Sequence, residues 1–155
     1  MDVIKKMIVS ALQADDQATV GLRALLSQAT TPYGIYHAIL PTTVSFASSK
    51  KYITYFQLTT NLDLSYPRVN MSTVPKQETY QITVWGGDTT TSNDKILARV
   101  RWILDGKRKV TNPTADASVY DIKLEWEGPD MWDEDLKIWT KSSRFRVWLG
   151  DNSNV

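Results

Sequence analysis

The segments ETYQITVWGG (Glu78–Gly87) and DKILARVRWILDGKR (Asp94–Arg108) contain the pattern that decides the fold of this chain. In the first segment, apolar and polar side chains alternate, which is typical of a half-buried strand. In the second, apolar residues recur at helical spacing, and Gly106 follows at the position where a left-handed residue ends many helices. The stretch therefore predicts a strand, a glycine turn and an amphipathic helix, and it contains no catalytic motif.

The flanking sequence predicts further helices and strands. Apolar residues recur at helical spacing over residues 3–12 and 20–26, and strand patterns cover residues 33–40, 52–60, 120–126 and 138–149. Strands that follow one another without helical crossovers favour antiparallel pairing. We expect an α+β fold, with an antiparallel sheet and two α-helices packed on one face, as a single two-layer domain over residues 1–155. Residues 150–155 are expected to form a flexible tail.

The composition is that of an ordinary globular protein, with 42% hydrophobic and 23% charged residues in a chain of 155. A chain of this length can bury a full core without crosslinks. The formal net charge of +1 provides no global field that would recruit nucleic acid or an anionic membrane. The chain has no cysteine, which excludes disulfides, thiolate metal sites and cysteine nucleophiles. No segment is apolar for long enough to cross a bilayer, so we expect a soluble protein with no membrane partner.

Catalytic equipment is sparse in this sequence. The single histidine, His37, lies in a predicted strand with no nucleophile motif, and we interpret it as a structural or surface residue. Gly86 and Gly87 precede a helix, but their spacing matches no phosphate-binding loop. Arg99 and Arg101 are interpreted as part of a solvated helix face. We therefore expect no catalytic residue, no metal ligand and no cofactor.

A run of acidic residues follows the strand at 120–126. Its members are Glu125, Glu127, Asp130, Asp133, Glu134 and Asp135. Carboxylate clusters can bind hard cations or act in acid–base pairs, but this run lacks the spacing and central glycine of a calcium loop. A solvated hairpin loop is the interpretation that we favour. Alternatively, the loop meets a basic patch, formed by Lys107, Arg108 and Lys109, on a neighbouring copy of the chain.

Residues 61–76 show no clean period and contain two prolines, which predicts a long loop. Long loops in compact domains are usually functional or disordered. Asn61, Asp63, Arg68 and Lys76 are the charged and polar positions that we select as candidate contact residues in this loop.

Five segments of the chain together resemble the tail-completion family (tail-terminator or head–tail joining proteins) of long-tailed bacteriophages. They are ETYQITVW (78–85), NDKILARVRWILDG (93–106), IKLEWE (122–127), DEDLKIW (133–139) and SRFRVW (143–148). The resemblance covers most of the chain, and it rests on patterns rather than on chemically diagnostic residues. The helix that ends in Leu-Asp-Gly and the acidic, aromatic turn before a final Arg-Phe-Arg-Val strand carry most of it.

The resemblance implies a structural virion protein, assembled in the host cytoplasm, that forms a ring, expected to be a hexamer, at the head-proximal end of the tail tube. Such a ring would end tail polymerisation and join the tail tube protein to the head–tail connector or stopper protein, with DNA passing through its lumen without sequence-specific binding. The basic and acidic residues named above would then form the seam between subunits, and the loop at 61–76 would line the lumen or dock on the tube. Three alternatives remain open: another tail-tube or neck connector protein, a metal-dependent hydrolase that uses the acidic loop, and a nucleic-acid-binding adaptor.

Overall fold

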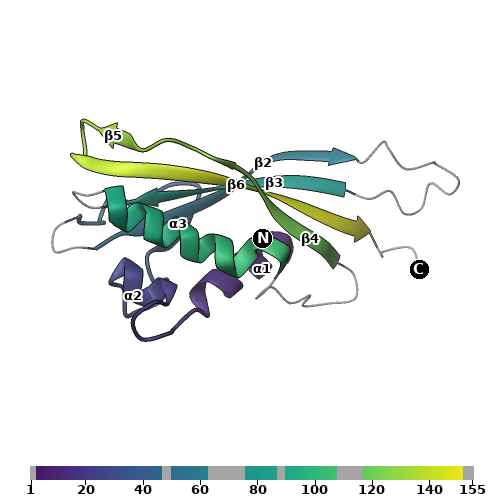
Figure 1. The fold of residues 1–155 in the computed structure, drawn as a ribbon, viewed down its shortest axis with the longest axis horizontal. Coiled ribbons are helices and arrows are strands. Elements are labelled where there is room, and N and C mark those ends of the chain that lie inside the picture. The colour runs from purple at the N-terminus through teal and green to yellow at the C-terminus, as the bar shows by residue number, and fades with distance from the viewer. Residues whose placement is uncertain (1–2, 47–49, 63–75, 87–89, 108–116, 152–155) are drawn as a thin grey trace, which may run out of the picture.

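A mixed sheet carries three helices on one of its faces (Figure 1). The computed structural model describes residues 3–46, 50–62, 76–86, 90–107 and 117–151. These residues form α1 (Val3–Gln13), α2 (Leu22–Leu26), β1 (Ile35–His37), β2 (Tyr52–Leu62), β3 (Lys76–Trp85), α3 (Thr90–Leu104), the 3-10 helix η1 (Asp105–Lys107), β4 (Ala117–Glu127), β5 (Met131–Asp133) and β6 (Ile138–Asp151). The predicted α+β fold with a two-layer arrangement is confirmed, although the described residues form three α-helices where two were predicted, because the short α2 packs beside α1 and α3.

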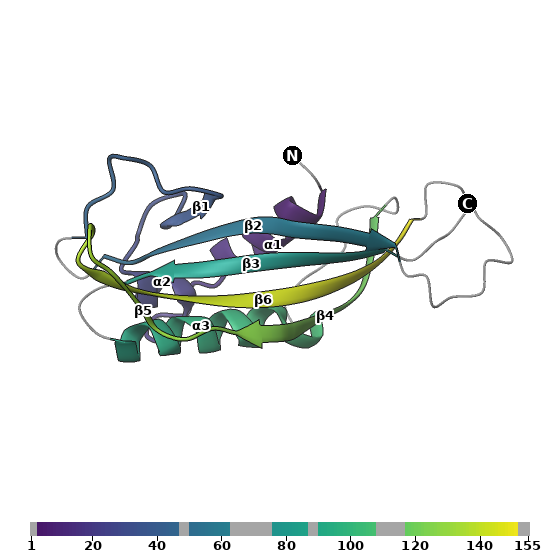
Figure 2. The same ribbon diagram turned by 90° about the horizontal axis from the view of Figure 1, so that it is seen from above.

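The strand order in the described sheet is β1-β2-β3-β6-β4, and β5 pairs with β6 beyond the end of β4. The long central strands β2, β3 and β6 run side by side in Figure 2. All pairings except one are antiparallel, as predicted. The exception is β1, which pairs with β2 in parallel. Residues 38–51 between these strands are numerous enough for the crossover that a parallel pair needs, and the sequence analysis missed this.

The core lies between the sheet and the helices, and it confirms the alternation in the opening sequence. Tyr80, Ile82 and Val84 on β3 are fully buried, as are Val147 on β6 and Phe145, which is opposite Tyr80. The apolar stripe of α3 covers them with Ile96, Leu97, Val100, Ile103 and Leu104, and α1 adds Ile4, Met7, Ile8, Ala11 and Leu12. Gly106 ends α3 with φ +69°, which confirms the predicted left-handed position.

Two predicted irregular segments are shorter than expected, because backbone pairing continues through polar residues that show no apolar period. Asn61 pairs with Gln77 and Leu62 pairs with Lys76, so the two ends of the predicted loop belong to a β2–β3 hairpin. Residues 150 and 151 belong to β6 and pair with residues 118 and 117 of β4, so the tail prediction is wrong there. Strands pair through backbone hydrogen bonds, so the pattern of apolar and polar side chains does not show where the pairing ends. No helix in the described part of the chain is long and apolar enough to span a bilayer.

Candidate assembly surfaces

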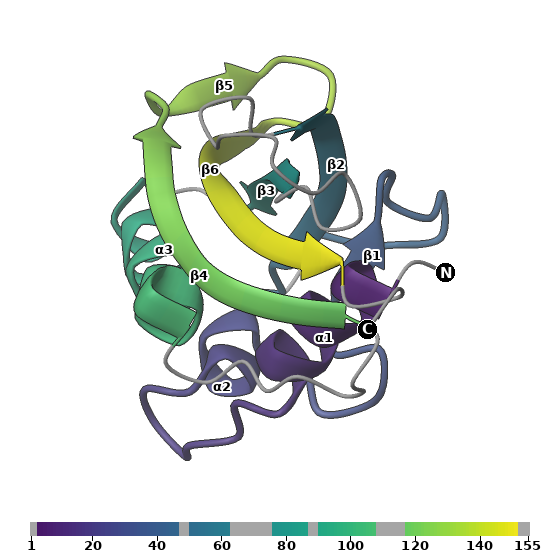
Figure 3. The same cartoon turned by 90° about the vertical axis from the view of Figure 1, so that its right-hand side faces the viewer.

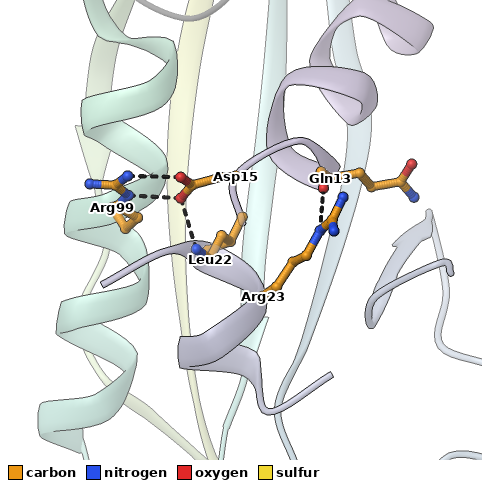
Figure 4. Close-up of polar contacts among 5 residues, drawn as sticks. All are labelled: Gln13, Asp15, Leu22, Arg23 and Arg99. Atoms are coloured by element: carbon orange, nitrogen blue, oxygen red, sulfur yellow. Dashed lines mark hydrogen bonds and ion pairs between the residues drawn. The ribbon is translucent and has the colours of Figure 1, made fainter. Parts of the chain in front are cut away.

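A buried ion pair fastens the three helices together (Figure 4). Asp15 follows α1, and its two carboxylate oxygens accept hydrogen bonds of 2.7 Å from Nε and Nη2 of Arg99 on α3. Its Oδ2 also accepts a hydrogen bond of 2.7 Å from the backbone N–H of Leu22, at the start of α2. The side chains of Arg99 and Asp15 are only 13% and 8% exposed. The interpretation of Arg99 as a solvated residue is therefore wrong. Its partner lies 84 positions earlier in the chain, so no local sequence pattern indicates the pair.

The hydrogen bond with Asp15 raises the pKa of the Arg99 guanidinium further above the physiological range, in which arginine is charged in any case. A second arginine ties α2 to the end of α1. Nε of Arg23 donates a hydrogen bond of 2.6 Å to the carbonyl oxygen of Gln13, and its guanidinium lies 3.8 Å from the ring centroid of Tyr33. These contacts fix α2 relative to α1 and α3.

An open groove lies between α2 and α3 and has a volume of about 480 Å³. We define the α2–α3 groove by its lining residues: Thr19, Val20, Leu25, Lys95, Ala98, Arg99 and Trp102. Its floor is largely apolar, Val20 is 53% exposed, and the Arg99 guanidinium lies 4.1 Å from the ring centroid of Trp102. The α3 members recur at spacings of three and four residues, so they share one helix face. The sequence analysis missed this groove, although that spacing was a readable signal.

The chain between β4 and β6 forms a compact turn that includes β5. We define the β5 turn as residues 127–137. Oδ1 of Asp133 accepts hydrogen bonds of 3.0 Å and 2.9 Å from the backbone N–H groups of Asp135 and Leu136. Nζ of Lys137 lies 3.1 Å from Oε2 of Glu134. Three large apolar side chains are nevertheless exposed on this turn: Met131 by 59%, Trp132 by 40% and Leu136 by 44%.

The acidic residues selected from the sequence gather on the β5 turn. Glu127, Asp130, Glu134 and Asp135 are exposed, and Asp133 is half-buried. Within one chain these five residues therefore lie at the surface of a turn, whereas Glu125, the first member of the acidic run, lies on β4 and forms an ion pair with Arg146. Among the residues that the structure describes, no group of three acidic or histidine side chains is placed to hold a metal ion.

Of the selected basic residues, only Lys107 lies in the described part of the chain, and it follows the C-terminal end of α3. It ends η1, whereas Arg108, Lys109 and the side chain of Lys107 lie outside the described residues. The β5 turn, by contrast, leads into the part of β6 beside the N-terminus of α3, where Nδ2 of Asn93 donates a hydrogen bond of 3.1 Å to the carbonyl oxygen of Trp139. A helix of 15 residues is about 22 Å long. Lys107 and the acidic candidates are therefore well separated within one chain.

The remaining selected positions give less information. Asn61 and Lys76 lie in the paired ends of β2 and β3, whereas Asp63 and Arg68 lie outside the described residues. His37 is exposed on β1, and its ring packs edge-on against Tyr55 with 5.4 Å between the centroids. This confirms the expected surface position of the histidine.

Two described arginines on the sheet face opposite the helices contact neighbouring side chains. Nε of Arg144 donates a hydrogen bond of 3.1 Å to Oε1 of Gln81, and its guanidinium lies 4.5 Å from the ring centroid of Trp126. Arg146 forms an ion pair with Glu125 on the neighbouring strand. Arginines that are engaged with neighbouring side chains do not make the phosphate-binding stripe of a dedicated nucleic-acid binder.

The arrangement defines a small α+β domain with a groove on its helical face and an acidic, apolar turn at one end of its sheet. No protein-family model matches the chain, and no curated protein matches it in sequence. Among solved structures, the fold is similar to that of a chain in the virion of a native gene transfer agent particle. The TM-score is 0.63 over 96% of this chain and 95% of that chain, at 15% sequence identity. At this identity the comparison shows a shared fold.

Proposed function

We propose that this chain is a structural virion protein of a tailed, phage-like particle. The observation that carries the proposal is the agreement in fold, over nearly the whole of both chains, with a component of a gene transfer agent virion. The resemblance of residues 78–148 to tail-completion proteins, found in the sequence without reference to any structure, supports the same class.

More specifically, we propose that copies of the chain form a ring, expected to be a hexamer, at the head-proximal end of the tail tube. The ring would stop tail polymerisation and contact the head–tail connector or stopper protein, with DNA passing through its lumen. The exposed acidic residues of the β5 turn would lie in the seam between subunits, together with the basic segment at 107–109. The β2–β3 hairpin, including Asn61 and Lys76, would face the lumen or the tube.

The test is to add the purified protein to its tail tube subunit while that subunit polymerises, and to measure tube lengths by negative-stain electron microscopy. We expect shorter tubes, each carrying a ring at one end, and a closed oligomer when the mixture is separated and its mass is measured by light scattering. Incorporation along the whole tube would instead support the alternative of a tail-tube protein. A protein that neither forms rings nor changes tube length would refute the proposed role.

The proposal of an acidic-loop hydrolase is weaker than the structural role. Asp133 uses Oδ1 to hold the turn, and Glu134 pairs with Lys137 within the same turn. Calorimetry with magnesium, manganese and calcium tests this alternative directly, and tight binding that disappears in Asp133→Ala would revive it.

A further inference from the structure

Two exposed surfaces of this chain have complementary chemistry. The α2–α3 groove is largely apolar and has the exposed Lys95 on its wall. The β5 turn presents three exposed apolar side chains among exposed carboxylates. We propose that the β5 turn of one copy docks in the α2–α3 groove of a second copy. This inference rests on the proposed ring, and it supplies a specific contact for it.

The apolar match is the first argument for this contact. Met131, Trp132 and Leu136 are 59%, 40% and 44% exposed, so much of their surface is not used in the core of their own domain. Val20, on the groove side, is 53% exposed. Contact between these surfaces would remove apolar area from water on both copies, and this is the main favourable term in protein association. Aromatic and methionine side chains are also the types enriched at interfaces.

The charges give the contact its direction. Asp130, Glu134 and Asp135 are exposed around the apolar side chains of the β5 turn, whereas Lys95 is exposed on the groove. The charge of Arg99 is matched within the chain by Asp15, so Lys95 is the groove residue best placed to attract the acidic turn. Complementary charges of this kind set the register and the choice of partner more than they set affinity.

The position of the two surfaces excludes their meeting within one chain. Viewed along the length of the molecule, β5 lies on the far side of the sheet from α2 (Figure 3). A contact between them must therefore join two copies, and within the proposed ring each copy gives its turn to one neighbour and its groove to the other, which makes the contact heterologous; a reciprocal pair of contacts about a two-fold axis would instead give a dimer. Heterologous contacts form a closed ring when the rotation between copies closes, whereas contacts of a surface with itself stop at a dimer.

Cysteine crosslinking tests the contact directly, because the chain contains no cysteine of its own. One variant carries Lys137→Cys, at an exposed position that leaves the three apolar side chains of the β5 turn in place, together with a size tag. The other carries Val20→Cys in the groove, and a short bismaleimide is added to the mixture. We expect a crosslinked heterodimer, and a ladder longer than a dimer when both substitutions are in one chain. The matched control replaces Val20→Cys by Ile39→Cys, a position that is 78% exposed and outside both surfaces. A yield no higher than that of the control would overturn the proposal.

Charge reversal provides a second measurement on the same crosslink. Lys95→Glu in the groove variant, or Glu134→Lys with Asp135→Lys in the turn variant, should each lower the heterodimer yield several-fold. Combining the reversed groove with the reversed turn should restore much of it. A heterodimer yield that neither charge reversal lowers would overturn the charge complementarity on which the proposal depends.

These experiments use the protein alone, without tail tube or connector, so they separate the contact from the proposed function. A specific crosslink in a protein that never alters tube length would retain the contact and defeat the tail role. A protein that caps tubes but gives only the control level of crosslinking would retain the role and defeat this contact.

Discussion

Two parts of the molecule are stabilised by different kinds of contact. One is the α2–α3 junction, which we define as the contacts of Asp15 with Arg99 and Leu22, and the other is the β5 turn. In the junction, the Asp15–Arg99 ion pair joins residues 84 positions apart, and both side chains are mostly buried. In the β5 turn, the hydrogen bonds to Asp133 and the ion pair of Glu134 with Lys137 join residues two or three positions apart, and they are exposed. The groove surface thus depends on the folded domain, whereas the turn depends mainly on its own sequence.

This difference assigns distinct parts to the two surfaces. A groove fixed by buried long-range contacts is a preorganised receptor, which lowers the entropic cost of binding. A turn with local contacts and exposed apolar side chains suits the role of the inserted segment. Substitutions in the junction should therefore lower the free energy of unfolding by much more than substitutions in the turn. Replacing an exposed apolar side chain of the turn should change assembly with little effect on stability.

The largest effect is expected from Asp15→Ala. Its removal leaves the part-buried Arg99 without its charged partner and the backbone N–H of Leu22 without its acceptor. Breaking such a pair should lower the free energy of unfolding by about 3 kcal/mol, measured by urea denaturation. The adjacent Asp16→Ala removes the same charge from an exposed position and should change it by less than about 0.5 kcal/mol. Equal effects of the two substitutions would show that the junction is not held by this pair.

Gly86→Ala comes next, at the point where the end of β3 meets the start of α3. A Cβ at Gly86 would lie 1.8 Å from Oδ1 of Asn93, whose side chain is fully buried. Overpacking of this kind should cost about 2 kcal/mol, measured as a fall in the free energy of unfolding. In the Asn93→Ala background the same substitution should cost much less, because the obstructing side chain is gone. If Gly86→Ala lowers the free energy of unfolding equally in the Asn93→Ala background, the clash with the Asn93 side chain is not the cause.

The fold could be predicted where local pattern decides it. The alternation around Tyr80 and the apolar stripe of α3 predicted elements that the structure confirms, as did Gly106, which takes the left-handed conformation. The parallel pairing of β1 could not be predicted, because β1 has only three residues and pairs through a crossover rather than a hairpin. The same holds for β5, whose three residues pair with β6 across a turn rich in charge.

The candidate surfaces could be predicted only in part. The acidic turn was visible in the sequence, and its role in a subunit seam is still a prediction, as is that of residues 107–109. Half of the groove was readable as well, since Lys95, Arg99 and Trp102 recur at helical spacing. The other half depends on where α2 packs, and the Asp15–Arg99 pair that fixes this is a tertiary contact with no local signal.

A smaller effect is expected from Asp133→Ala, which tests whether the β5 turn has a preferred shape of its own. The substitution removes the acceptor of two backbone N–H groups in an exposed turn. It should lower the free energy of unfolding by roughly 0.5–1 kcal/mol in chemical denaturation. Asp135→Ala removes an equal charge two residues away and should have no measurable effect. If both variants match the wild type, the turn is held by its pairing with β6 instead.

The smallest effect on stability is expected from Leu136→Ala. This variant tests most directly whether the β5 turn contributes to assembly rather than to the stability of its own domain. Leu136 is 44% exposed on the β5 turn, whereas Leu26 on α2 is fully buried. Leu136→Ala should change the free energy of unfolding by less than about 0.5 kcal/mol, and Leu26→Ala should lower it by roughly 2–5 kcal/mol. Yet Leu136→Ala, with Lys137→Cys supplying the turn thiol, should reduce crosslinking to Val20→Cys relative to Lys137→Cys alone. A large loss of stability would mean that Leu136 packs in its own domain, and the turn would then offer one apolar side chain fewer to a second copy.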